Sequence, residues 1–151
     1  MKKSEIAENL FKEGYNCAQS VVGAFCEEIG MEFSEAVKII SGFGGGMGRM
    51  REVCGAVSGM VFVLGCKFGY NLPTEVALKK ELYERIQTVV KAFSETQGSI
   101  ICRDLLPEKD GADTAPQPSQ RTIEYYKRRS CSGCVACAAG ILEKYLRCCA
   151  Q

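Results

Sequence analysis

A long amphipathic segment constrains the fold most strongly. It reads LPTEVALKKELYERIQTVVKAFSETQG and runs from Leu72 to Gly98, with apolar residues recurring at intervals of three and four. This period places them on one face of an α-helix, with Thr74 as the expected N-terminal cap and Gly98 as the C-terminal stop. The segment therefore predicts a helix with one buried side. That side is formed by Leu82, Ile86, Val89, Val90 and Phe93.

Helix signals recur along the rest of the chain. Asn16 and Gln19 form a capping box, which makes Cys17 the first residue of a helix that Gly30 ends. No alternation typical of strands extends beyond a few residues, so we predict an all-α fold, a compact bundle of about five to six helices in a single domain over residues 1–151. The other expected helices are 4–14, 34–41, 55–68, a short turn after Ser99, and one from Thr122 or Ser130 to about Arg147. Residues 107–120, rich in Pro, Asp and Gly, predict a surface loop.

Composition excludes several classes of function. Apolar residues make up 46% of the chain and charged residues 25%, and the formal net charge is +1, so neither disorder nor a polyanionic partner is expected. We therefore expect no nucleic-acid partner. The longest apolar stretch, residues 53–66, is shorter than the roughly 20 residues of a membrane span. The N-terminus carries acidic residues where a signal peptide would be apolar, so we expect a cytoplasmic protein.

The chemistry must come from cysteine, because the chain has ten cysteines and no histidine. The absence of histidine removes Ser-His and Cys-His catalysis and every imidazole metal ligand. Without an export signal, the cysteines indicate thiol chemistry, metal binding or apolar packing rather than a disulfide framework.

Four cysteines are expected at helix N-termini: Cys17, Cys54, Cys102 and Cys131. Unpaired amide groups and the helix dipole stabilise negative charge there, which favours the thiolate, the form that acts as nucleophile and metal ligand. Arginines adjacent in sequence to the last three reinforce this expectation. They are Arg49, Arg51, Arg103, Arg128 and Arg129.

The remaining cysteines divide into three groups. Cys26 and Cys66 lie toward helix ends near an apolar face and are expected in the core. Cys134 and Cys137 follow Cys131 at three-residue spacing. We weigh a redox role for a Cys131/Cys134 pair equally against simple packing of Cys134 and Cys137. Cys148 and Cys149 receive no predicted role.

The segment GFGGGMGR, residues 42–49, precedes Cys54. It lacks the Lys-Ser/Thr ending of a phosphate-binding loop and no strand precedes it, so nucleotide binding is not expected. Backbone N–H groups of Gly44, Gly45 and Gly46 are candidates to bind a cofactor by donating to thiolates or cluster sulfides. The competing interpretation is that the glycines let the chain turn beneath a closely packed helix.

Four stretches together resemble a known family: YNCAQSV, GFGGGMGR with EVCGAVSG, CRDLL, and CSGCVACAAGIL. The chain is similar to the C_GCAxxG_C_C family of redox-active proteins, whose four cysteines fall on Cys17, Cys54, Cys102 and Cys131. The arrangement also resembles the cysteine-bearing portion of split-Soret cytochromes, where cysteines hold an iron–sulfur cluster. The haem part of that resemblance fails, because the chain has no C-x-x-C-H.

Three hypotheses follow for function. The favoured one is a redox-active cysteine protein, in which the four cysteines are catalytic and carry out thiol–disulfide or electron-transfer chemistry with an unidentified redox partner. The alternative is a module in which the same four cysteines bind an iron–sulfur cluster or another metal. The third is a helical interaction protein whose cysteines only pack. The apolar, glycine-lined faces would also suit a homodimer.

Overall fold

The chain is described by a computed structural model that covers residues 1–150. This part of the chain forms ten α-helices and no strand, only one isolated antiparallel bridge. The helices are α1 (Lys3–Lys12), α2 (Cys17–Ala24), α3 (Cys26–Ile29), α4 (Phe33–Ile40), α5 (Gly55–Phe68), α6 (Val76–Gln97), α7 (Cys102–Leu105), α8 (Glu108–Ala112), α9 (Ile123–Arg128) and α10 (Cys131–Cys149). A 3₁₀ turn, Ser41–Phe43, follows α4. The all-α prediction is confirmed.

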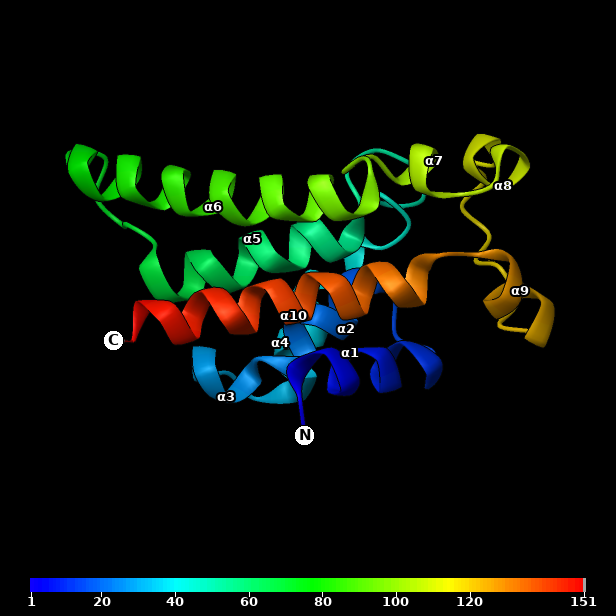
Figure 1. Ribbon diagram of the computed structural model, residues 1–151, viewed down its shortest axis with the longest axis horizontal. Helices are drawn as coiled ribbons and strands as arrows, with labels where there is room; N and C mark the ends of the chain where they lie inside the picture. The colour runs from blue at the N-terminus through cyan, green and yellow to red at the C-terminus, as the bar shows by residue number, and fades with distance from the viewer. Residues whose placement is uncertain (151) are drawn as a thin grey trace.

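The long helices pack side by side around one apolar core. Helix α6 lies over α5, α10 lies next to both, and α1 covers the opposite side of α10 (Figure 1). Helix α2 fills the interior between α1, α5 and α10. The N-termini of α5 and α10 lie at the same end of the bundle, beside α7 (Figure 1). This end contains the cavity described below.

The number of helices exceeds the predicted five to six because four of them are only four to six residues long. Such helices are shorter than two turns, so they carry no usable periodicity. Helix α8 lies within the segment predicted as a loop. The expected 17–29 helix is divided at Phe25, whose N–H donates to the carbonyl of Val22, three residues back. The last predicted element is likewise two helices, α9 and α10.

Predicted caps were correct at several ends and wrong at others. The capping box of Asn16 and Gln19 is present, and Gly98 ends α6 with a left-handed backbone. Thr74 does not cap α6, because that helix begins one residue later than expected, after Glu75. In the predicted stripe of α6, Leu82, Val89 and Phe93 are buried, and the other two residues are partly buried against the core.

Helix α5 approaches α2 closely because it carries glycine on the facing side. A Cβ atom on Gly55 would lie 3.0 Å from the Phe43 carbonyl oxygen and 3.1 Å from the Cys17 Cβ. A Cβ atom on Gly59, one turn later, would lie 2.9 Å from the Val21 Cβ. All three distances are shorter than ordinary van der Waals contacts, so any larger residue would push the segments apart.

No helix within residues 1–150 combines the length and apolar character needed to cross a membrane.

Candidate functional site

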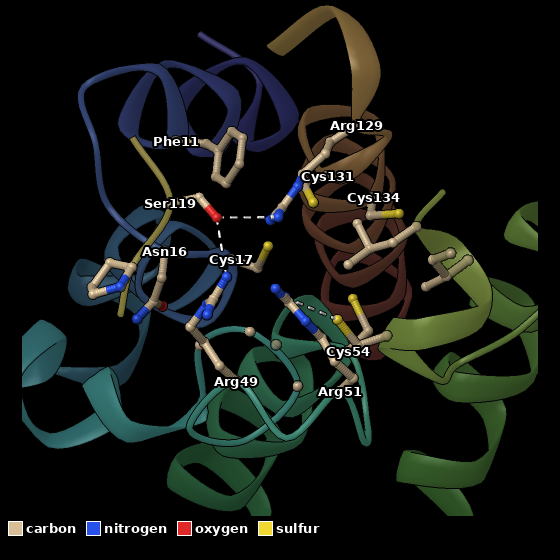
Figure 2. Close-up of a pocket in the computed structure, with 18 of the residues that line it drawn as sticks. Phe11, Asn16, Cys17, Arg49, Arg51, Cys54, Ser119, Arg129, Cys131 and Cys134 are labelled. Atoms are coloured by element: carbon tan, nitrogen blue, oxygen red, sulfur yellow. Dashed lines mark hydrogen bonds between the residues drawn. The ribbon is translucent and has the colours of Figure 1, made fainter. Parts of the chain in front are cut away.

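The four predicted cysteines line one cavity of about 440 Å³. Figure 2 labels three of them, Cys17, Cys54 and Cys131. Cys17, Cys102 and Cys131 are the first residues of α2, α7 and α10, and Cys54 is the N-terminal cap of α5. Their predicted positions at helix N-termini are therefore confirmed. Tertiary structure brings together thiols separated by more than a hundred residues of sequence.

A short backbone pairing holds Cys54 beside Cys102. The Cys54 N–H donates to the carbonyl of Ile100 at 2.8 Å, and the Cys102 N–H donates to the carbonyl of Glu52 at 2.6 Å. These bonds flank the isolated antiparallel bridge between the two segments. The segment before α5 therefore fixes the start of α7, and both cysteines face the cavity.

The glycine-rich loop forms another wall of the cavity, with Gly44, Gly45 and Gly46 among its lining residues. A Cβ atom on Gly46 would lie 2.6 Å from the Cys102 Cβ, and one on Gly44 would collide with the Asn16 side chain. The Gly44 N–H already donates to the Ser41 carbonyl. The glycines therefore have a clear packing reason, while cofactor binding by their N–H groups stays a prediction.

Arg51 is a fully buried cation at this site, with 1% of its surface exposed. Its backbone is left-handed, with φ of 62°, an uncommon conformation for a side-chain-bearing residue. The guanidinium Nε donates to the Asp113 carbonyl at 3.0 Å, and Nη1 lies 3.9 Å from the Cys102 Sγ. Nη2 is buried and has no hydrogen-bond partner among residues 1–150.

The strongest interactions among the cavity thiols join Cys17 to Cys131 and Cys54 to Cys134. Weaker interactions also connect Cys17 with Cys54 and Cys102. Cys134 Sγ in addition donates to Gln97 Oε1 at 3.6 Å. Cys54 and Cys134 are buried, whereas Cys17 and Cys131 are partly exposed. The more accessible pair therefore joins the N-termini of α2 and α10, and the second pair lies deeper.

Cys131 has the most acidic thiol of the accessible pair. A hydrogen bond from the Cys17 thiol, together with the positive charges of Arg129, Arg121 and Arg51, outweighs burial and lowers the pKa of Cys131 to about 7. About half of this thiol is therefore ionised near neutral pH. The Cys134 pKa is also lowered, mainly by a hydrogen bond from Cys54.

The expectation that all four helix-terminal cysteines favour the thiolate is wrong for three of them. Donating to Cys131 raises the pKa of Cys17 well above its ordinary value, and burial raises it further. The Cys54 pKa is raised mainly because this thiol donates to Cys134. Burial raises the Cys102 pKa, although Arg51 opposes the change. Desolvation and neighbouring thiols outweigh the helix terminus at these positions.

Cys134 is a fifth thiol of the cavity and was not among the four predicted site residues. The signal for it was present, since Cys134 follows Cys131 by three residues and so lies on the same face of α10. Cys137 packs against the core away from the cavity, and Cys148 and Cys149 are exposed. Cys66 is also exposed and Cys26 only partly buried, so the prediction that Cys66 lies in the core is wrong.

Arg121 is a lining residue that the sequence did not reveal. It donates to the carbonyls of Phe11 at 2.8 Å and Tyr15 at 3.0 Å, and its guanidinium lies over the rings of Phe11 and Tyr125. These contacts fix a charge that comes from the residue directly after the predicted loop, 107–120. No local pattern around Arg121 predicts this position.

The thiols do not form a preformed metal site. Within the part of the chain that the structure describes, no group of three or more Cys, Asp or Glu side chains is arranged to hold a metal ion. The largest interactions join the sulfurs two by two, although Cys17 and Cys102 also interact with Cys54. The Arg51 guanidinium lies beside Cys102. As placed in residues 1–150, the thiols are therefore not arranged as the preformed ligands of an iron–sulfur cluster or zinc, which need several thiolates converging on one point.

The fold and the site together define an all-α, cysteine-rich protein whose helix-terminal thiols meet in one cavity lined by arginines. The chain belongs to the C_GCAxxG_C_C family, described as "Putative redox-active protein (C_GCAxxG_C_C)", whose model matches residues 15–145. No curated protein and no solved structure matches the chain significantly. The predicted family is thus confirmed.

Proposed function

We propose that this protein carries out thiol–disulfide exchange, with Cys131 as the nucleophile and Cys17 as the resolving thiol. The observation that carries the proposal is the Cys17–Cys131 thiol pair, which joins two helix N-termini inside one cavity. Both residues are partly exposed and line the cavity, so a reactant that enters the cavity lies next to their thiols. Positive charge around Cys131 supports its role as the attacking thiolate.

The reaction consists of two exchanges. The Cys131 thiolate attacks one sulfur of a substrate disulfide, forms a mixed disulfide, and releases the other sulfur as a thiolate that takes up a proton. Cys17 then loses its proton and attacks the Cys131 Sγ. This step breaks the mixed disulfide, forms a Cys17–Cys131 disulfide and releases the second thiol. The substrate disulfide gains two electrons, and an external dithiol reductant must reduce the protein for another cycle.

Cys134 is the competing resolving thiol, because it lies three residues from Cys131 in a C-x-x-C arrangement. Its interaction with Cys54 favours Cys17 for this role. The two assignments predict different disulfides after oxidation, Cys17–Cys131 or Cys131–Cys134. They are therefore separable by peptide mapping.

The test begins with anaerobic purification, followed by visible absorption spectroscopy and by assays for iron, acid-labile sulfide and free thiols. We expect a colourless protein with ten reduced thiols, of which mild oxidation removes two. Mass spectrometry should locate the new disulfide at Cys17–Cys131, and Cys131→Ser should abolish it. The matched control Cys66→Ser changes an exposed thiol outside the cavity and should leave the disulfide unchanged.

Two results would contradict the proposal. One is stoichiometric iron and sulfide with visible absorption that is lost in the Cys17→Ser variant, which would instead support the four-cysteine cluster. The other is oxidation that leaves both Cys17 and Cys131 reduced. A Cys131–Cys134 disulfide would retain the nucleophile but reassign the resolving thiol.

A further inference from the structure

The walls of the cavity are strongly basic. Its lining residues within the described chain include four arginines and no aspartate or glutamate: Arg49, Arg51, Arg121 and Arg129 line it. Thiol–disulfide exchange does not by itself require such a set of guanidinium groups. The positive charge of the cavity therefore indicates that its ligand is anionic.

Two of these arginines have ion-pair partners that do not line the cavity. Arg129 pairs with Asp110 at 2.8 Å, and Arg49 lies 3.5 Å from a carboxylate oxygen of Asp113. Both guanidinium groups also donate to the Ser119 hydroxyl (Figure 2). The carboxylates thus position the arginines from outside, and none of them contributes negative charge to the cavity lining.

Arg51 provides a second observation, separate from the overall charge of the cavity, that indicates a ligand. Its side chain points into the cavity among the thiols (Figure 2), and its Nη2 is buried without an acceptor. A buried charged donor left without a partner is costly, and native structures rarely keep one without a functional reason. Because Nη2 has essentially no accessible surface, a rotation of the guanidinium toward the cavity would bring it within reach of an anionic oxygen, which would supply the acceptor. A charge-assisted bond of this kind is among the strong hydrogen bonds.

The size and the remaining walls indicate a small molecule. A cavity of about 440 Å³ lies within the usual range for small-molecule sites, roughly 300–1,000 Å³. Phe11, Tyr125, Pro116 and Pro118 add apolar surface beside the arginines. This combination suits a compact ligand with an apolar body and an oxyanion end.

We propose that the cavity is a binding site for a small disulfide that carries carboxylate or similar oxyanion groups, with Arg51 as the principal anion-binding residue. The oxyanion accepts from the free Nη2 of Arg51, and this places the disulfide sulfur beside Cys131. The inference rests on the proposed exchange reaction and specifies its substrate class. Arg51 is a binding residue in this scheme, and the thiols perform the chemistry described above.

The anion site can be tested without any thiol chemistry. Suberate is an unreactive dicarboxylate whose chain length matches that of dithiodipropionate, and octanediamine is a dicationic counterpart. Each is titrated into the reduced Cys131→Ser variant and followed by calorimetry or by amide chemical shifts. We expect suberate to bind and the diamine not to bind. Adding Arg51→Gln should weaken suberate about tenfold or more, because a hydrogen bond to a charged group is lost.

The matched control is Arg147→Gln, which removes the same charge from an exposed position that does not line the cavity. It should leave suberate affinity unchanged. If Arg51→Gln fails to fold, Arg51→Lys and the unmodified protein still decide the question. In the unmodified protein, dithiodipropionate should react with Cys131 at least about tenfold faster than dicationic cystamine, and added salt should reduce the difference.

The outcomes separate the two proposals. Binding of suberate without exchange at Cys131 would uphold the anion site and overturn the redox role. Equal exchange rates with anionic, neutral and cationic disulfides, together with no suberate binding, would overturn the anion site and leave the redox role intact. Equal loss of suberate affinity in Arg51→Gln and Arg147→Gln would also overturn the assignment to Arg51.

Discussion

The acidity of Cys131 should depend on the thiol of Cys17. In the structure, the hydrogen bond from Cys17 is the largest cause that lowers the pKa of Cys131 from the ordinary 9.0 to about 7. The substitution Cys17→Ala removes this donor and leaves the surrounding arginines in place. We therefore expect the pKa of Cys131 to rise. The hydrogen bond from Cys17 stabilises the Cys131 thiolate more than the neutral thiol, and the substitution removes it.

The structure sets the size of the change. The difference between 9.0 and about 7 corresponds to about 3 kcal/mol in favour of the thiolate. A hydrogen bond to a charged group accounts for about 1.5–3 kcal/mol, so its loss should move the inflection of Cys131 upward by at least about one pH unit. The thiolate fraction near pH 7 would then fall from about half to about a tenth. A more basic thiolate is intrinsically more nucleophilic, so the rate near pH 7 should fall only about twofold.

The inflection is therefore the decisive readout rather than the rate at one pH. Alkylation by iodoacetamide over a range of pH, with peptide mapping by mass spectrometry, isolates Cys131 from the other thiols. In the unmodified protein, the rate should rise through about pH 7 and level off above it, because the thiolate accumulates above its pKa. Cys66→Ser is the control and should not move the inflection. An unchanged inflection in Cys17→Ala would refute the proposed hydrogen bond.

Three further predictions concern the charges and the packing around the site. Arg129→Gln should also raise the pH at which the alkylation rate of Cys131 has its inflection, but by less than Cys17→Ala does, because Arg129 contributes a smaller favourable interaction. A larger rise in Arg129→Gln than in Cys17→Ala would contradict this ranking of the two interactions. Gly55→Ala should lower the free energy of unfolding, measured in urea, by about 1–3 kcal/mol because it overpacks the contact with α2. The control Gly65→Ala lies in the same helix, where the new Cβ contacts nothing, and should be neutral or stabilising. Equal stabilities of the two variants would contradict the close approach of the helices. Asp110→Asn should cost about 3–5 kcal/mol in the same assay because it leaves the buried Arg129 charge without its carboxylate, and a change below about 1 kcal/mol would refute that pair.

Much of the local structure could be predicted because its causes are local. The capping box at Asn16, the left-handed ends at Gly30 and Gly98, and the apolar stripe of α6 each depend on residues within a few positions of one another. The same reasoning placed Cys17 and Cys131 as the first residues of helices. The expected cytoplasmic location, homodimer and redox partner stay predictions.

The missed features depend on contacts between distant segments. Arg121 reaches the cavity through carbonyls more than a hundred residues away, and Cys134 joins the thiols through its interaction with Cys54. The exposure of Cys66 depends on which face of α5 other helices leave uncovered. No periodic pattern and no motif in the sequence signals any of these contacts.

The sequence by itself determined which residues begin the helices, since caps, glycines and apolar spacing act within one or two turns. It therefore determined that several cysteines occupy helix N-termini. Only the tertiary structure decided that these ends meet, that the thiols associate as two pairs, and that Arg51 is buried among them without an acceptor. The physical reason is that pKa values, burial and unsatisfied charge depend on every group nearby in space. Those groups come from α2, α7, α10, the N-terminal cap of α5 and the loop that carries Arg51, which lie far apart in the sequence.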